Sequence, residues 1–109
     1  MQSEILIEHA QFAIGQPVRH QLLEYRGIVV DVDPRFRFST EWFGATMKGE
    51  HSSEQPWYHV LVHNTNQLTY VPEEQLLLDA SAEEFEHPVL ELLFTRDAAG
   101  HYQRRTNLQ

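Results

Sequence analysis

Cysteine is absent from this 109-residue chain. Its absence excludes disulfide bonds, thiolate catalysis and cysteine-ligated zinc, and it fits a reducing compartment. No apolar run approaches the ~20 residues that a membrane-spanning helix requires. Near the amino terminus, Glu4 and Glu8 interrupt the short apolar stretch Ile5–Ile7. We therefore expect no signal peptide and a cytoplasmic location.

Basic side chains are also scarce. The chain has 8 Lys and Arg against 16 Asp and Glu, which gives a net charge of −8. Residues 1–48 hold five basic and six acidic side chains, whereas residues 49–109 hold three and ten. Because proteins bind DNA largely by placing Lys and Arg on phosphates, this charge opposes DNA binding. An acidic surface suits docking on a basic patch of another protein.

Glycine is limited to five scattered residues, so no Gly-rich phosphate-binding loop is present. The serines Ser39, Ser52 and Ser53 lie outside any nucleophile-elbow pattern. The sequence therefore predicts no catalytic residue and no cofactor, and we expect a protein that is not an enzyme.

The chain does contain a series of β-branched and aromatic runs that end in turn residues. Strands are predicted at residues 17–21, 26–34, 55–62 and 67–71. Gly27 is expected to supply a positive φ in the turn before the second strand. Together these runs predict one all-β domain over residues 1–109, a small SH3-like, partly open antiparallel β-barrel with one or two short helices.

The alternation of side chains in the second strand predicts its two faces. Because side chains of a strand point alternately to its two faces, every second residue is expected on the core face: Ile28, Val30 and Val32. The same alternation places Val29, Asp31 and Asp33 on the other face, which we expect to be partly solvated. Further along, residues 72–76 resemble a 3₁₀ turn, and a helix is expected to begin at Pro88 with Val89, Leu92 and Leu93 on one side.

Four motifs, in this order, resemble a known family. They are Phe12-x-Ile14-Gly15-Gln16-x-Val18-Arg19-His20, Tyr25-Arg26-Gly27-x-Val29-Val30-Asp31-x-Asp33-Pro34, Pro56-Trp57-Tyr58-His59-Val60 and Tyr70-Val71-x-Glu73-Glu74-x-Leu76. The combination resembles the HspQ (YccV-like, hemimethylated DNA-binding) heat-shock family. The resemblance covers residues 12–77, the core of the domain, and leaves residues 78–109 as a carboxy-terminal extension.

The resemblance implies two roles for a small bacterial heat-shock protein. One is a specificity-enhancing partner of the Lon protease in the turnover of DnaA and denatured proteins. The other is a DNA-binding module that prefers hemimethylated sites. The resemblance also implies a small homo-oligomer, specifically a trimer. The charge balance favours the adaptor over direct reading of DNA, which would require a basic element among the phosphates.

Histidines and aspartates offer two candidate metal or catalytic groupings. His59 and His63 have a spacing that would converge on a helix, but on a strand their Cα atoms lie ~13 Å apart. Asp31 and Asp33 share a strand face ~7 Å apart, and a solvated strand end explains them better than two-carboxylate hydrolysis. We expect His20 and His59 to bond across the sheet, and no metal site is predicted.

Two further sets of residues are candidates for binding partners. The basic side chains Arg19, Arg26, Arg35 and Arg37 are candidates for DNA contacts, because two of them alternate with Phe36 and Phe38 as on nucleic-acid surfaces. The alternative is that these arginines pair with nearby carboxylates. The candidates for protein interaction are Trp57, Tyr58, Glu73 and Glu74, where an exposed aromatic beside an open strand edge would accept an extended peptide. At least one of Trp57 and Tyr58 is expected to be buried, since they lie on opposite strand faces.

Overall fold

Strand pairing dominates the structure, a computed structural model that describes residues 10–38 and 54–105. One antiparallel sheet has the order β4-β3-β2-β1-β5, and β6 pairs with β7 in a separate hairpin. The elements are β1 (Pro17–His20), β2 (Arg26–Asp33), β3 (Trp57–Val62), β4 (Leu68–Pro72), η1 (Glu73–Gln75), β5 (Leu76–Leu78), α3 (Leu90–Leu93), β6 (Phe94–Arg96) and β7 (Tyr102–Arg104). The predicted all-β class is confirmed, as are the four predicted strands, with small shifts of their ends.

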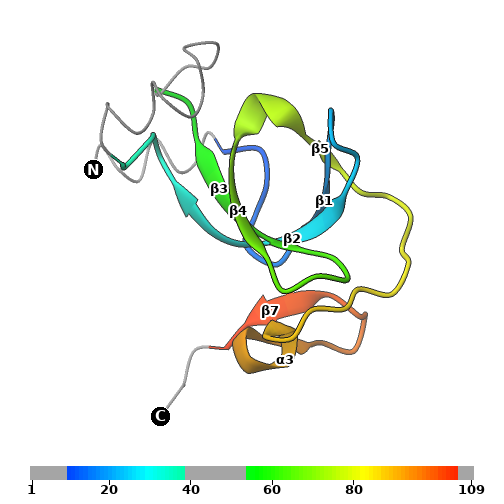
Figure 1. Ribbon diagram of the computed structural model, residues 1–109. Helices are drawn as coiled ribbons and strands as arrows, with labels where there is room; N and C mark the ends of the chain where they lie inside the picture. The colour runs from blue at the N-terminus through cyan, green and yellow to red at the C-terminus, as the bar shows by residue number, and fades with distance from the viewer. Residues whose placement is uncertain (1–9, 39–53, 106–109) are drawn as a thin grey trace.

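The five-stranded sheet curls around the first of two apolar cores (Figure 1). β4 and β5 are its two edges and do not pair with one another, so the barrel is partly open, as predicted. The core inside the curl consists of Phe12, Val18, Val29, Tyr58, Val60, Val71 and Leu76. Each of these side chains is at least nine-tenths buried. This core holds together the strands that the sequence motifs predicted.

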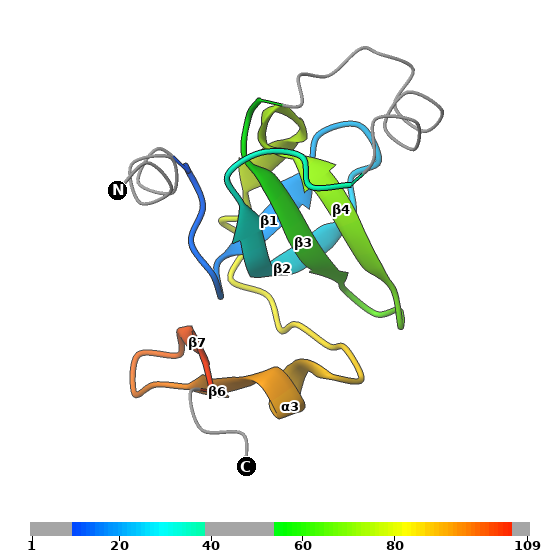
Figure 2. The same cartoon turned by 90° about the vertical axis from the view of Figure 1, so that its left-hand side faces the viewer.

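A second core lies between the outer face of the sheet and the carboxy-terminal extension. Figure 2 shows α3 and the β6–β7 hairpin as a separate layer beneath the five-stranded sheet. This core consists of Ile28, Val30, Leu61, Phe85, Leu90 and Phe94. Because the extension covers this outer face, β2 is buried on both sides. The expectation that Val29 faces solvent is wrong, because Val29 faces the inner core and is 0% exposed.

A β-bulge in β2 changes the predicted alternation of its side chains. The pairing with β3 runs from Val29 opposite Val60 directly to Asp31 opposite His59, so Val30 has no partner. A bulge adds one residue to one strand and turns the residues after it to the opposite face. Val32 therefore packs with the inner core that contains Val29 and not beside Val30, which corrects the predicted set of Ile28, Val30 and Val32.

Gly27 has a different role from the predicted one. It lies within β2, and it is not among the residues with positive φ. Glu24 adopts the left-handed conformation in the preceding turn, with a φ of 64°. A Cβ at Gly27 would lie 2.3 Å from Val60 Cγ1 and 2.7 Å from the carbonyl oxygen of Leu61. Gly27 is therefore required for the close approach of β2 and β3.

Helical structure is limited in the described residues. The predicted 3₁₀ turn is present as η1. The helix expected from Pro88 begins at Leu90 and lasts four residues. Of its predicted apolar side, Val89 and Leu93 do pack against the second core, whereas Leu92 is exposed and Leu90 is buried in its place. No helix in the described part of the chain is long and apolar enough to cross a membrane.

Candidate interaction surfaces

Two of the four predicted arginines are bound to one buried carboxylate. Arg26 Nε donates to Asp79 Oδ2 at 2.7 Å, and its other nitrogens donate to the carbonyl oxygens of Glu83 and Glu84. Arg19 lies 3.8 Å from the other oxygen of Asp79. Burial raises the pKa of Asp79, but the hydrogen bonds from Arg26 and Ser81 outweigh it and lower that pKa below its ordinary value. Arg26 thus fastens the extension to the sheet.

The other two arginines lie beyond the opposite end of β2. Arg35 is 3.6 Å from Glu54, and Arg37 is 3.4 Å from Asp33. Both arginine side chains are more than three-fifths exposed, and the neighbouring Phe38 is 52% exposed. The structure therefore separates the four arginines into two pairs, one at each end of β2, and all four have a carboxylate within 4 Å.

Trp57 and Tyr58 are both 0% exposed, so neither side chain is accessible to a partner. Trp57 packs against Phe36 and stacks on Tyr70, with ring centroids 4.9 and 5.3 Å apart. Tyr58 lies in the inner core and donates its hydroxyl to Glu73 Oε1 at 2.5 Å. Burial raises the pKa of Tyr58, and the Glu73 carboxylate raises it further. The two aromatics face opposite sides of β3, and each side is covered.

The two glutamates of η1 differ in their surroundings. Glu73 accepts from the amide of Gln11 as well as from Tyr58, so its carboxylate is turned toward the protein. Glu74 is exposed, and its backbone amide donates to Gln55 Oε1. Of the four residues predicted for protein interaction, only Glu74 has an exposed side chain.

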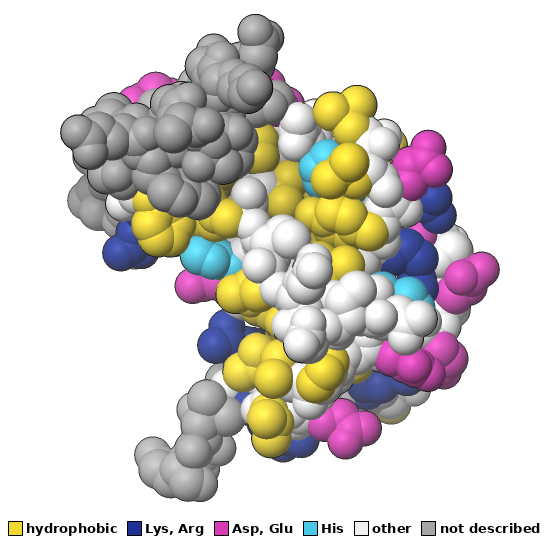
Figure 3. Space-filling model, viewed as in Figure 1, with side chains coloured by type: hydrophobic (Ala, Val, Ile, Leu, Met, Phe, Trp, Pro, Cys, Tyr) yellow, Lys and Arg dark blue, Asp and Glu magenta, His cyan; other side chains and the backbone are white. Residues whose placement is uncertain are grey.

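Four leucines that the sequence reasoning did not single out are exposed on neighbouring segments. Leu22 and Leu23, in the turn after β1, are 69% and 72% exposed, and Leu77 and Leu78 of β5 are 48% and 57% exposed. The turn lies beside β5, because His20 pairs with Leu76 and the amide of Gln21 donates to the carbonyl of Gln75, the residue before β5. We call these four residues the leucine surface. Hydrophobic side chains also gather over β1 and β5 in Figure 3.

The sequence contained a signal for this surface. Leu76-Leu77-Leu78 is a continuous apolar run on one strand, and a half-buried strand can place only alternate residues in the core. Leu76 is buried and Leu77 is exposed, as that alternation requires, whereas Leu78, two residues after Leu76, is exposed as well. β5 is also an edge strand that pairs only with β1 among the described strands. Edge strands present backbone groups to which another chain can pair.

The histidines have separate structural partners. His20 is buried, and its Nδ1 accepts from the amides of Leu22 and Leu23 at 3.1 and 3.0 Å. Burial lowers the pKa of His20. His63 Nδ1 accepts from the amide of Glu86, whereas His59 Nε2 lies 3.0 Å from Asp33 Oδ2. His59 therefore bonds across the sheet as predicted. His20 bonds to the side chain of Gln75, which precedes the neighbouring strand β5, and also holds the turn that carries two exposed leucines.

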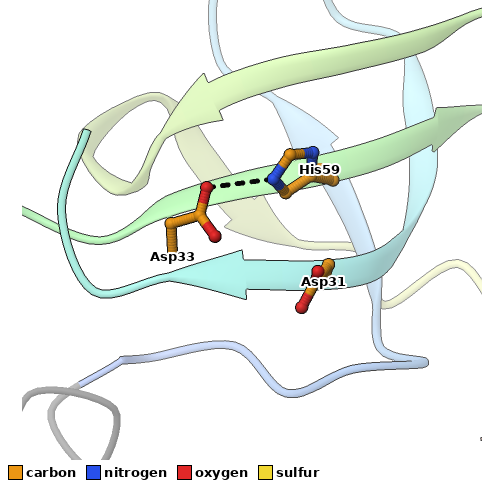
Figure 4. A group of neighbouring side chains, drawn as sticks. All are labelled: Asp31, Asp33 and His59. Atoms are coloured by element: carbon orange, nitrogen blue, oxygen red, sulfur yellow. Dashed lines mark hydrogen bonds and ion pairs between the residues drawn. The ribbon is translucent and has the colours of Figure 1, made fainter. Parts of the chain in front are cut away.

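Asp31 and Asp33 lie on the same face of β2, opposite His59 of β3 (Figure 4). The nearest ligand atoms of the three side chains all lie within 4.8 Å of one another. Asp33 is buried and also accepts from the Tyr70 hydroxyl at 2.8 Å. Burial raises the pKa of Tyr70, and its hydrogen bond to Asp33 raises it further. The sequence placed the two aspartates together but did not place His59 beside them.

A cleft of about 610 Å³ separates the lead-in to β1 from the carboxy-terminal hairpin. Ile14, Glu83, Arg96, His101 and Tyr102 are among the residues that line it. His20, His59 and Asp31 are not among the residues that line this cleft.

One comparison identifies the family. Residues 10–101 match the family described as hemimethylated DNA-binding protein YccV-like. The match includes all the strands of the five-stranded sheet and extends through α3 and β6. It also agrees with the resemblance that the four sequence motifs carried. The chain belongs to the YccV-like family of hemimethylated DNA-binding proteins.

Proposed function

We propose that this protein is a non-enzymatic adaptor that binds other proteins through its leucine surface and promotes their degradation by a Lon-type protease. Its partners are then the protease and substrates such as denatured proteins and DnaA. The observation that carries the proposal is the exposure of Leu22, Leu23, Leu77 and Leu78 beside an open strand edge. Exposed apolar side chains that gather on neighbouring segments often mark protein-interaction sites.

The open edge of β5 supports the binding of an extended segment. Arg19 of β1 lies opposite Leu77 of β5. On one side of this pair the backbone amide of Gln21 donates to the carbonyl of Gln75, and on the other side the amide of Asp79 donates to the carbonyl of Pro17. Antiparallel bonding alternates, so the amide and carbonyl of Leu78 point away from β1. A denatured substrate could add to this edge and place apolar side chains against the leucines.

The charge of the protein also supports a protein partner over DNA. The net charge is −8, and each of the four candidate arginines has a carboxylate within 4 Å. To contact DNA, these arginines would have to exchange their carboxylate partners for phosphates, and the remaining acidic residues would repel the phosphates.

The test measures proteolysis of a chemically unfolded substrate by purified Lon protease with and without this protein. We expect the wild-type protein to accelerate proteolysis and the double variant Leu22→Ser/Leu23→Ser to lose most of that effect. Leu92→Ser is the matched control, because Leu92 is 66% exposed on α3 and lies outside the leucine surface. Equal stimulation by all three proteins would exclude the leucine surface, and no stimulation with several substrates would exclude the adaptor role.

A second candidate function is the binding of hemimethylated DNA, and the family description favours it. Arg35 and Arg37 alternate with aromatic rings and have exposed guanidinium groups, and Phe38 beside them is half exposed. Such a segment could contact phosphates and stack on a base.

This alternative predicts that Arg35→Gln/Arg37→Gln weakens DNA binding, whereas Arg96→Gln on the carboxy-terminal hairpin does not. Loss of two phosphate contacts should reduce the salt slope of log K by about 1.8. Titration of hemimethylated and unmodified duplexes of the same sequence tests the specificity. Equal affinity for both duplexes would contradict a preference for hemimethylated DNA.

We also propose that the protein forms a small homo-oligomer, with a trimer as the expected form. The other edge of the sheet, β4, pairs only with β3 among the described strands, and it supports self-association because oligomers often bury such edges. Analytical ultracentrifugation over a range of concentrations tests this proposal. A monomer at every concentration would contradict it.

A further inference from the structure

We propose that Asp31, Asp33 and His59 bind one divalent transition-metal ion, of which Zn²⁺ and Mn²⁺ are the representatives to test. The sequence contained no helical or cysteine-based metal motif, and the site arises from two strands. Each residue contributes one ligand atom, and these atoms lie within 4.8 Å of one another. This inference is independent of the adaptor and DNA-binding functions proposed above.

The distances between the ligand atoms are close to those of a metal site. Nitrogen and oxygen ligands lie about 2.0–2.2 Å from zinc, so two ligands of a tetrahedral ion are about 3.4 Å apart. His59 Nε2 and Asp33 Oδ2 are already 3.0 Å apart. The Asp31 ligand atom, which lies within 4.8 Å of the other two, needs to move inward by up to about 1.4 Å on the same geometry. Asp31 is exposed, so side-chain rotation can supply that movement.

The β-bulge at Val30 makes the site. In a regular strand Asp31 and Val30 would point to opposite faces. The bulge instead sets Asp31 directly opposite His59, while Asp33 returns to the same face two residues later. From the carboxy-terminal hairpin, Arg104 Nη1 donates to the carbonyl oxygen of Val30 at 2.6 Å. The carboxy-terminal hairpin therefore holds the bulge that places Asp31.

Asp33 is oriented by groups around it, as metal ligands usually are. Its side chain is only 5% exposed, and Oδ2 accepts from the Tyr70 hydroxyl at 2.8 Å. The Tyr70 ring packs on His59 with centroids 4.7 Å apart. Arg37 is the competing cation, but it is 3.4 Å from Asp33 Oδ1 and its side chain is 69% exposed. A metal ion can displace a contact that is this long and exposed.

Charge and ligand type select the ion. Two carboxylates and a neutral imidazole balance a divalent cation, which lowers the cost of burying Asp33. An imidazole ligand disfavours Mg²⁺ and Ca²⁺, which prefer oxygen donors, and favours ions such as Zn²⁺. Carboxylates suit Mn²⁺ as well. Since the protein supplies three ligands, water or a partner group would complete the coordination.

The experiment uses the full-length protein, titrated calorimetrically with Zn²⁺ and with Mn²⁺. We expect one equivalent of metal and a loss of at least tenfold in affinity for Asp31→Asn and His59→Gln. Asp31→Asn is the decisive variant, because this exposed residue can be changed without a cavity. His101→Gln is the matched control, since His101 forms an exposed pair with Asp97 at 3.6 Å and should retain wild-type affinity.

A spectroscopic measurement separates this site from the other histidines of the chain. Bound Mn²⁺ should show pulsed-EPR coupling to one imidazole nitrogen, and that coupling should disappear in His59→Gln and persist in His101→Gln. The proposal is overturned if neither metal binds at micromolar concentration. It is equally overturned if Asp31→Asn binds as tightly as the wild-type protein, since the metal would then occupy another site.

Discussion

Arg26 Nε lies 2.7 Å from Asp79 Oδ2, so the first residue of β2 is joined to the residue after β5. The Asp79 side chain is 2% exposed and the Arg26 side chain 12%, which makes the pair almost fully buried. The pair could not be predicted from the sequence, because the two residues are 53 positions apart. The pair also accounts for why Arg26, a predicted DNA contact, has its guanidinium directed into the fold.

Asp79→Asn should destabilise the protein by about 2 kcal/mol, because hydrogen bonds to a charged group contribute about 1.5–3 kcal/mol. The pKa of Asp79 is lowered in the folded state, so its contribution is fully present above the ordinary aspartate value of 3.8 and is lost as pH falls through the lowered pKa. Urea denaturation of both proteins between pH 7 and pH 3 measures this. A constant stability difference over that whole range would contradict the assignment.

His20 predicts a second pH dependence, in a higher range. Burial lowers its pKa below 6.5, so the unfolded chain takes up a proton more readily than the folded protein. Stability should therefore be fully present above pH 6.5 and decrease as pH falls below it. His20→Asn keeps an acceptor near the position of Nδ1 but does not titrate, so this part of the decrease should disappear. Unfolding free energies at pH 7.5 and 5.0 test this, with the exposed His101→Asn as the control; an unchanged pH dependence in His20→Asn would exclude the role.

Gly27→Ala should destabilise the sheet through a steric clash. The new Cβ would lie 2.3 Å from Val60 Cγ1 and 2.7 Å from the carbonyl of Leu61, so β2 and β3 would have to separate. Overpacking of this kind costs about 1–3 kcal/mol. Thermal and urea unfolding measure the loss. Wild-type stability in the variant would mean that β2 and β3 approach less closely than described.

Phe94→Ala should show that the carboxy-terminal extension is part of the folded unit. Phe94 is 2% exposed and packs with Ile28 and Leu61 beneath the sheet. Loss of a buried phenyl ring costs about 3–5 kcal/mol. Leu92→Ala, in the same segment but 66% exposed, should change stability by only about 0.5 kcal/mol. If the two variants are equally stable, the extension does not contribute to the core.

Much of the fold could be predicted because strand formation depends on local features. The runs at 17–21, 26–34, 55–62 and 67–71 each contain β-branched or aromatic residues and end at turn residues, and each is a strand in the structure. The 3₁₀ turn after β4 follows equally local signals. The faces of β2 could not be predicted, since the bulge at Val30 depends on pairing with a strand that is distant in the chain.

The candidate sites were predicted less completely. The aspartates of β2 could be placed on one face by counting residues, but His59 joins them only through the register of β2 and β3. The four arginines looked like one basic group in the sequence and divide into two pairs in space. Trp57 and Tyr58 were candidates for a surface, and both are covered: Tyr58 lies in the inner core, and Trp57 packs against Phe36 and Tyr70.

The amino-acid sequence by itself determined the all-β class, the positions of four strands and the family, because these follow from patterns among neighbouring residues. Only the tertiary structure decided which side chains are accessible and which meet. The leucine surface, the Arg26–Asp79 pair and the Asp31–Asp33–His59 group depend on contacts between segments far apart in the chain. Such contacts arise from strand register and from the extension that covers the sheet, and neither is encoded in a local pattern.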